Sequence, residues 1–200
     1  MSAVDSRLVE AMAEQLRRRR AAARVGWKLG IGERERLGGI VVGNLTSATV
    51  LPPGAVYRSD GGDLHADAEI AVRIGTDGEI NGYAAALGLV DLAGPPDDAF
   101  WAIAENVFHR AVAFGPWTEE WPGEIEGALR INDETSRSGP ADADAEARLD
   151  EARRVLDAAG ERLEPGDFVI TGNIVQLPVR PGDRVEADLG SLGRVALEIA

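Results

Sequence analysis

Three side chains able to bind a metal or move a proton alternate through the segment 65-HADAEIAVRIG-75. Successive side chains of a strand point to opposite faces, so His65, Asp67 and Glu69 are predicted to share one face. The Cα atoms of Asp67 and Glu69 would lie about 6.5 Å apart, close enough to converge on one hard cation. His65 would lie about 13 Å from Glu69, so on a straight strand it would act as a base or an outer hydrogen-bonding group.

The same alternation is also typical of a half-exposed strand whose polar face meets water. A magnesium or manganese site would need a third oxygen ligand from another part of the chain. The segment alone therefore leaves a metal site and a solvated strand face as two open interpretations.

The basic residues are 20 arginines and one lysine, Lys28, which lies between glycines in 26-GWKLG-30. An arginine bias of this strength normally reflects genome composition, which replaces surface lysines freely. Lysine differs from arginine as a compact point charge whose pKa shifts readily on burial. Lys28 is therefore either a functional residue or a chance survivor of the bias.

Composition excludes several function classes. The 34 acidic residues outnumber the 21 basic ones and give a net charge of −13, which argues against nucleic acid as a partner. Without cysteine there is no disulfide, thiolate zinc site or cysteine nucleophile. No apolar run approaches the roughly 20 residues that span a bilayer, and the N-terminus does not have the pattern of a secretory signal. We expect a cytoplasmic protein without a membrane partner.

Apolar periodicity predicts helices over 2–23, 98–114 and 142–159, with Ser2 and Asp5 in a capping-box spacing and Gly160 as a stop. The basic cluster of Arg17–Arg20 with Arg24 is expected to be a solvated end of the first helix. Trp117 and Trp121 are expected in a loop packed on the surface, and His109 as a packing or surface residue of the second helix. The predicted strands cover 24–30, 39–43, 55–58, 67–75, 79–89, 126–132, 167–171, 183–188 and 193–199.

The tripeptide Pro-Gly-Asp precedes two of these strands, in 164-EPGDFVI-170 and 180-RPGDRVEA-187. Proline and then glycine suit the central positions of a type II turn, so both tripeptides predict turns at strand entries. Many strands, few helices and no alternation of strand and helix favour an α+β fold. We expect a helical arm over 1–23 and a single domain over 24–200.

The order of several segments resembles the 2-keto-4-pentenoate hydratase branch of the fumarylacetoacetate hydrolase superfamily. The C-terminal part is the most similar, with its Thr-Gly, its Pro-Gly-Asp turn and its final Leu-Gly-X-Val strand. The resemblance covers most of the chain from about residue 24 and rests on five segments: 26-GWKLG-30, 67-DAEIAVRIG-75, 83-YAAALGLVD-91, 104-AENVFHRAVAFG-115 and 171-TGNIVQLPVRPGDRVEADLGSLGRVALEI-199.

The resemblance implies layered, rolled β-sheets with an N-terminal helix and two further helices, in homodimers or larger homo-oligomers. It also implies a lyase of the hydratase or decarboxylase type acting on a small 2-keto acid. In such enzymes a divalent cation, Mg²⁺ or Mn²⁺, stabilises the enolate. Asp67 and Glu69 match the metal-binding Glu-X-Glu pair, and Lys28 matches a lysine that meets the substrate. Thr171 and Gly172 match the Thr-Gly that borders the substrate.

The chain departs from the family pattern at the third metal ligand. Gly88, in 86-ALGLVD-91, occupies the place of the family's third acid, and Asp91 should point to the opposite face of a regular strand. The acid-containing loop after the lysine is also shortened, to 32-GERERLGGIVVG-43.

Two hypotheses follow from this departure. In the first, the chain is an enolate-stabilising enzyme with a weakened or rebuilt metal site, in which His65 or Asp91 compensates as a base or ligand. In the second, the fold serves without metal catalysis, as a binding or regulatory protein or as a catalyst that needs only the pocket and Lys28.

Overall fold

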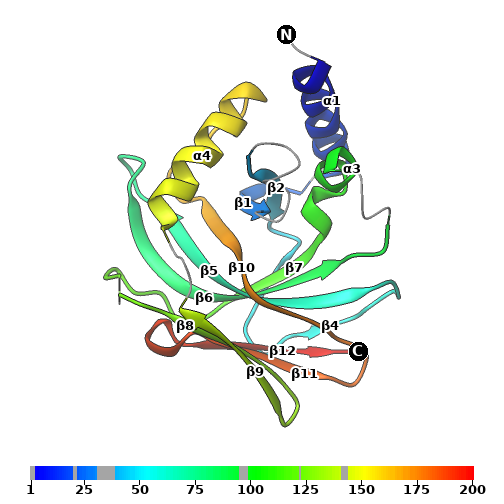
Figure 1. Ribbon diagram of the computed structural model, residues 1–200, viewed down its shortest axis with the longest axis vertical. Helices are drawn as coiled ribbons and strands as arrows, with labels where there is room; N and C mark the ends of the chain where they lie inside the picture. The colour runs from blue at the N-terminus through cyan, green and yellow to red at the C-terminus, as the bar shows by residue number, and fades with distance from the viewer. Residues whose placement is uncertain (1–2, 20–21, 31–38, 95–98, 122, 141–143) are drawn as a thin grey trace.

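The computed structural model describes residues 3–19, 22–30, 39–94, 99–121, 123–140 and 144–200. Figure 1 shows the described elements and labels most of them. In chain order they are α1 (Ala3–Arg18), β1 (Arg24–Gly30), β2 (Val41–Thr46), β3 (Val50–Leu51), β4 (Val56–Tyr57), β5 (Leu64–Ile74), β6 (Ile80–Asp91), α3 (Ala99–Ala104), the short turn η1 (Asn106–Phe108), β7 (His109–Phe114), β8 (Glu126–Ile131), β9 (Glu134–Pro140), α4 (Ala145–Ala158), β10 (Phe168–Pro178), β11 (Arg184–Asp188), η2 (Gly190–Leu192) and β12 (Arg194–Ile199).

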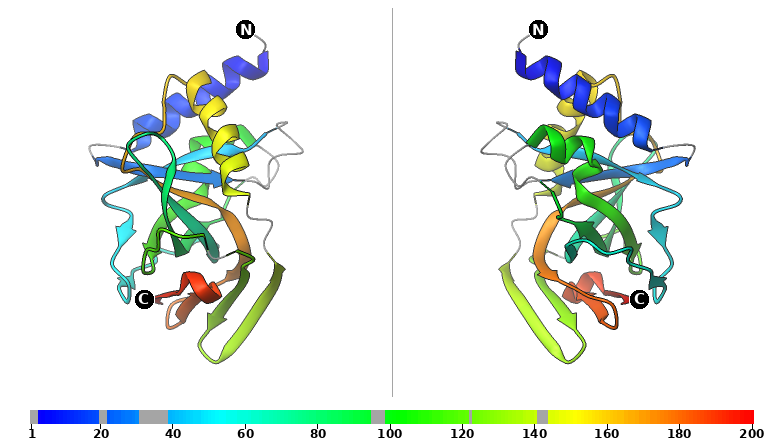
Figure 2. Two further views of the ribbon diagram at one scale, coloured as in Figure 1. Left: turned by 90° about the vertical axis from the view of Figure 1, so that its left-hand side faces the viewer. Right: turned by 90° about the vertical axis from the view of Figure 1, so that its right-hand side faces the viewer.

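The strands form two curled sheets that pack against each other. The larger has the order β2-β1-β10-β5-β6-β7-β3, and the smaller has the order β4-β12-β11-β8-β9. In Figure 1 the smaller sheet lies below the larger one, and α1, α3 and α4 lie above the larger sheet. The two views of Figure 2 confirm that α1 and the smaller sheet are at opposite ends. This arrangement confirms the predicted α+β class with layered, rolled sheets. No described helix has the length and apolarity needed to cross a bilayer.

The central strand β5 is buried on both faces. Ala68, Ile70 and Val72 point into the main core between the sheets, as the alternation predicted. The opposite face carries Asp67 and Glu69, which are also buried, with exposed fractions of 2% and 0%. The interpretation of this face as a solvated surface is therefore wrong.

Most predicted elements are observed with shifted ends. The first predicted strand has its predicted bounds of 24–30, and the third helix covers Ala145–Ala158, where the Asp144 carboxylate caps the first turn by accepting from the Ala147 N–H. Both Pro-Gly-Asp turns are confirmed, because Gly166 and Gly182 have positive φ angles of 90° and 99°. Ser2 of the predicted capping box lies outside the described residues.

The predicted helix over 98–114 is wrong after its first half. Helix α3 ends at Ala104, and the chain then makes a left-handed turn at Asn106, Val107 and Phe108, with φ angles of 59°, 53° and 61°. This conformation costs an L-residue about 1–2 kcal/mol, so it needs compensating interactions. Beyond the turn the chain continues as strand β7, which places His109 in the sheet instead of on a helix.

The side chain of Asn106 compensates the left-handed turn. Its Oδ1 accepts from the Asn44 N–H at 2.6 Å, and its Nδ2 donates to the Asn44 carbonyl at 2.9 Å. Gly43 permits this approach, because a Cβ there would lie 2.7 Å from the Asn106 carbonyl oxygen. The Asn106 side chain thus makes the two hydrogen bonds to strand β2 that the backbone of a neighbouring strand would otherwise make.

We expect Asn106→Ala to destabilise the protein by about 2–4 kcal/mol, measured by urea unfolding. It removes two hydrogen bonds of about 1 kcal/mol each and puts a less tolerant residue in the left-handed region. Asn106→Asp retains the acceptor for the Asn44 N–H and should lose less stability than Asn106→Ala. Equal stability of the alanine variant and the wild type would show that the two bonds do not hold the turn.

Candidate functional site

Four neighbouring strands bring the predicted site residues together. Lys28 of β1 is in register with Ile170 of β10, and Asp67 of β5 is in register with Gly88 of β6. Strand β10 lies between β1 and β5 and contributes Gln176, the register partner of Asp67. The segments separated in sequence therefore meet on one face of the larger sheet.

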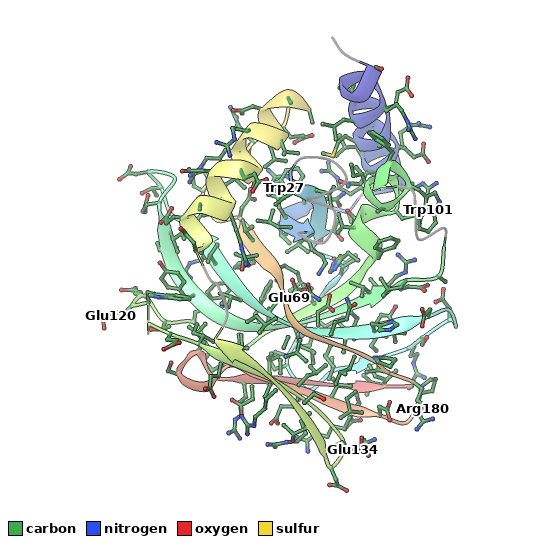
Figure 3. All side chains as sticks on the ribbon, in the orientation of Figure 1. Trp27, Glu69, Trp101, Glu120, Glu134 and Arg180 are labelled. Atoms are coloured by element: carbon green, nitrogen blue, oxygen red, sulfur yellow. The ribbon has the colours of Figure 1, made fainter. Side chains whose placement is uncertain are left out.

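Lys28, Asp67 and Glu69 form a buried ion cluster. The Lys28 Nζ donates to Glu69 Oε1 at 2.6 Å and to Asp67 Oδ2 at 3.3 Å. The other oxygen of Asp67 accepts from Gln176 Nε2 at 2.7 Å. Figure 3 shows Glu69 in the middle of the molecule, below Trp27. The one lysine of the chain is thus held by the two carboxylates that the sequence proposed as metal ligands.

Burial and charge change the protonation of this cluster. Burial would lower the pKa of Lys28, but the charges and hydrogen bonds of Glu69 and Asp67 outweigh it and hold the pKa above its ordinary value. Burial raises the pKa of Glu69 to about 7; the Lys28 charge opposes this rise, the Asp67 charge adds to it, and the backbone N–H of Gly172 acts against it. Lys28 is therefore a stable ammonium ion beside a carboxyl group that gains a proton easily.

The Pro-Gly-Asp turn before β10 fixes the strand that carries Lys28. Its Asp167 accepts two hydrogen bonds from Arg24, at 2.6 and 2.7 Å, and one from the Trp27 indole at 3.2 Å. Gly26 allows β1 and β10 to come close, because a Cβ there would lie 1.9 Å from the carbonyl oxygen of Phe168. The glycine before Lys28 and the aspartate of the turn are therefore positioning residues.

A cavity of about 230 Å³ opens beside the ammonium group. Lys28, Asp67, Asn173 and Gln176 form its polar side. Its apolar wall comes from β1, β2, the end of β6, α3 and η1, and includes Val41, Val90, Ala102, Val107 and Phe108. The left-handed turn is thus part of the wall of the site.

Comparison with solved structures identifies the fold. A 4-oxalocrotonate decarboxylase from Pseudomonas putida G7, in complex with magnesium and adipate, superposes with a TM-score of 0.84 at 19% identity, over 96% of this chain and 86% of that one. The chain has the fumarylacetoacetate hydrolase-like fold. A fumarylpyruvate hydrolase from Pseudomonas aeruginosa, in complex with Mn²⁺ and pyruvate, shares it with a TM-score of 0.63 at 19% identity, over 89% and 90% of the two chains.

A 5-carboxymethyl-2-hydroxymuconate delta-isomerase from Mycobacterium smegmatis is similar to a comparable degree. Its TM-score is 0.61 at 20% identity, and the match covers 90% of this chain and 79% of that one. A scan against protein-family models and a search of curated protein sequences gave no match. The superfamily resemblance seen in the sequence is confirmed at the level of the fold.

Within this fold, the donor set does not fit a divalent site built from three acids. A Cβ at Gly88 would lie 2.6 Å from Glu69 Oε1, so the Glu69 carboxylate occupies the direction in which a third acid would point. Among the described residues, no three histidine, aspartate or glutamate side chains come together in a group that could hold a metal. The ammonium of Lys28 bridges the remaining two carboxylates. The expected Mg²⁺ or Mn²⁺ at Asp67 and Glu69 therefore stays a prediction that this geometry disfavours.

The other predicted residues lie around the cluster without lining the cavity. His65 Nδ1 is 3.1 Å from the carbonyl oxygen of Asp63, and the Thr171 hydroxyl donates to the Ile70 carbonyl at 3.1 Å. Gly172, with a φ of 109°, lies where the register of β10 shifts, and its N–H acts on Glu69. Their proposed roles as base and as substrate contacts remain predictions.

Asp91 does not compensate for Gly88. One of its oxygens accepts from the N–H groups of Asp63 and Ala93, and the other is 3.4 Å from Arg110. The expectation that this carboxylate is a poor substitute for a third ligand is consistent with these contacts.

Sequence reasoning missed Asn173, Gln176 and the role of His109. The predicted strand stopped at residue 171, although Asn173 follows the Thr-Gly motif directly and Gln176 comes three residues later. His109 is in register with Val90, which is itself in register with His65, so it lies on the cluster face. It is buried, and neither ring nitrogen has a hydrogen-bond partner among the described residues.

Burial, together with the charges of Lys28 and Arg110, lowers the pKa of His109 to about 3. As the pH falls below about 6.5, the unfolded chain binds a proton at this residue and the folded chain does not. Because of His109, the free energy of unfolding therefore falls as the pH is lowered from about 6.5 to about 3.

We expect the free energy of unfolding, measured with urea at each pH, to fall less between pH 7 and pH 4.5 in His109→Leu than in the wild type. Leucine cannot be protonated, and all other titrating groups remain in both proteins, so the difference isolates His109. Parallel pH curves for the two proteins would contradict the assignment of a neutral, buried imidazole.

Proposed function

We propose that the chain is an enzyme of the hydratase or lyase type that stabilises the enolate of a small 2-keto acid or related compound in the cavity beside Lys28. The observation that supports this most directly is a buried ammonium group that lines a largely apolar cavity. A preformed positive charge in a site of low polarity stabilises a developing negative charge far better than water does.

Lys28 has a donor left for a ligand. An ammonium group carries three N–H donors, and two of them are committed to Glu69 and Asp67. The third has no hydrogen-bond partner among the described residues and can meet the carboxylate or the developing enolate oxygen of a 2-keto acid. The amides of Asn173 and Gln176 line the same cavity and supply further polar contacts.

Asp67 is the candidate for moving the proton. It is the only acidic side chain among the described residues that line the cavity, and it is hydrogen-bonded to both Lys28 and Gln176. General acid–base catalysis needs such a group within reach of the substrate's acidic C–H bond. Removal of that proton gives the enolate, whose oxygen would lie toward Lys28.

Exchange of the C3 protons of 2-oxobutanoate in D₂O, followed by ¹H NMR, tests this proposal before the overall reaction is known. We expect the wild type to accelerate the exchange, because hydration, decarboxylation and C–C cleavage share the enolate. Ala102→Leu narrows the cavity without touching the ion cluster and should abolish the acceleration. Ala158→Leu, on the exposed side of α4, is the matched control and should leave it unchanged.

Absence of exchange in the wild type, together with binding of oxalate as an enolate mimic, would favour a second function. The fold would then serve as a binding or regulatory protein, which the loss of the third acid at Gly88 also favours. Absence of both exchange and oxalate binding would refute the proposed class of substrate. Assembly as a homo-oligomer and a cytoplasmic location stay predictions.

A further inference from the structure

We propose that the ammonium group of Lys28 is the resident cation of the Asp67–Glu69 pair and that the pocket works without a divalent metal. This inference deepens the proposed function, because it names the source of positive charge in the same site. Its test measures metal binding and stability, so it can fail or hold independently of any turnover.

The hydrogen bonds of the two carboxylates carry the inference. Three of their four oxygens accept from Lys28 or Gln176 at 2.6 to 3.3 Å. The fourth, Glu69 Oε2, is buried, and Glu69 is not among the residues that line the cavity. A cation entering from the cavity would therefore meet the ammonium group before it met a free carboxylate oxygen.

The charge balance leads to the same conclusion. With both acids ionised, two carboxylates and one ammonium carry a single net negative charge, and protonation of Glu69 removes it. A divalent ion between the acids would lie in contact with the positive Nζ. Repulsion between like charges at this distance is severe in a buried site. Magnesium usually keeps several waters and is bound through one or two carboxylates, but here both carboxylates are already hydrogen-bonded to Lys28 or Gln176.

The packing around Gly88 fits a site in which the Lys28 ammonium group binds the two carboxylates. The Glu69 carboxylate lies where a side chain at position 88 would begin, 2.6 Å from the position of its Cβ. Gly88→Glu alone therefore cannot restore three converging acids, because Glu69 would have to move and give up its contact with Lys28.

Calorimetry and electron paramagnetic resonance with Mn²⁺ test the inference. We expect no binding to the wild type at millimolar Mn²⁺. We expect Lys28→Ala to gain Mn²⁺ binding and a rise in melting temperature with Mn²⁺, because the two acids lose their cation. The matched control is Lys28→Ala/Glu69→Gln, which should not gain either property.

Tight Mn²⁺ binding by the wild type would overturn the inference, and so would a Lys28→Ala protein that folds and binds no Mn²⁺. Because Lys28→Ala leaves two buried charges uncompensated, it is also refolded with Mn²⁺ present, where metal-dependent folding supports the inference. If it folds under neither condition, Mn²⁺ titration of the wild type decides: the absence of binding at millimolar Mn²⁺ supports the internal cation, and binding at that concentration refutes it.

A second observation carries an independent inference, at a cleft of about 470 Å³ below the end of α1. The charged and amide residues that line it are Arg18, Arg19, Arg110, His109, Gln15, Asn44, Asn106 and one acid, Glu105. Such a concentration of arginine contrasts with the net charge of −13. The sequence predicted only a solvated helix end here.

The unpartnered atoms of the structure gather at this cleft. Four buried side-chain nitrogen or oxygen atoms lack a hydrogen-bond partner among the described residues, and three of them, Arg19 Nε and the two His109 nitrogens, belong to residues lining the cleft. Arg18 is bound to Glu14 and Glu105, and Arg110 reaches Asp91 at 3.4 Å. Buried polar groups are nearly always satisfied, so these nitrogen atoms are candidates for contacts with a bound ligand.

We infer that this cleft binds a small oxyanion, a phosphate or a carboxylate. The guanidinium groups of Arg19 and Arg110 supply charge and donors, and neutral His109 can donate one N–H. Oxyanions match the planar donors of arginine better than other small ligands do.

Calorimetry with inorganic phosphate and with acetate distinguishes the two anions. We expect one of them to bind at millimolar concentration and Arg19→Gln to weaken it by about tenfold or more, as the loss of a charged hydrogen bond implies. Arg17→Gln is the matched control, because Arg17 is exposed, pairs only with Glu14 in the described structure and does not line the cleft. Binding of neither anion, or equal weakening by both variants, would overturn this inference.

Discussion

The buried contact between Lys28 and the carboxylates of Glu69 and Asp67 is the interaction on which the arrangement of this molecule depends. A buried ion pair is a poor source of stability, because desolvation of the charges offsets their attraction. An ion pair at the centre of the larger sheet is therefore expected either to be held in place by the surrounding strands or to serve a function. The structure provides the support through β1, β5 and β10, which must lie side by side for the three charges to meet.

Several local features serve this one contact. Strand β1 runs parallel to β10 at a distance that only Gly26 permits, and Asp167 holds β1 there through Arg24 and Trp27. The Pro-Gly-Asp turn read from the sequence as a strand entry is thus also part of the frame around Lys28. Gly172, at the shift of register in β10, brings a backbone N–H toward Glu69. Turn residues and glycines determine where the charges lie.

The sequence predicted the parts of this fold that follow a regular period. The alternation around Asp67 and Glu69 gave their common face, and the single lysine pointed to Lys28. The alternation did not predict that this face is buried, because the elements that cover it come from other parts of the chain. The helix predicted over 98–114 failed because Ile103, Val107 and Phe108 have helical spacing, while the two side-chain hydrogen bonds of Asn106 favour a left-handed turn. Contacts between distant residues decide such positions.

The left-handed turn explains why two otherwise separate sites share one segment. Because helix α3 ends at Ala104 and β7 begins at His109, Val107 and Phe108 form the wall of the cavity beside Lys28. Asn106 and His109, at the two ends of the same turn, line the arginine-rich cleft. A strained conformation of three residues without glycine persists only where its surroundings fix it, and such strain is concentrated at functional sites. An oxyanion in the cleft would contact His109, an imidazole on which the charge of Lys28 already acts, so occupancy of one site would alter the electrostatic field of the other.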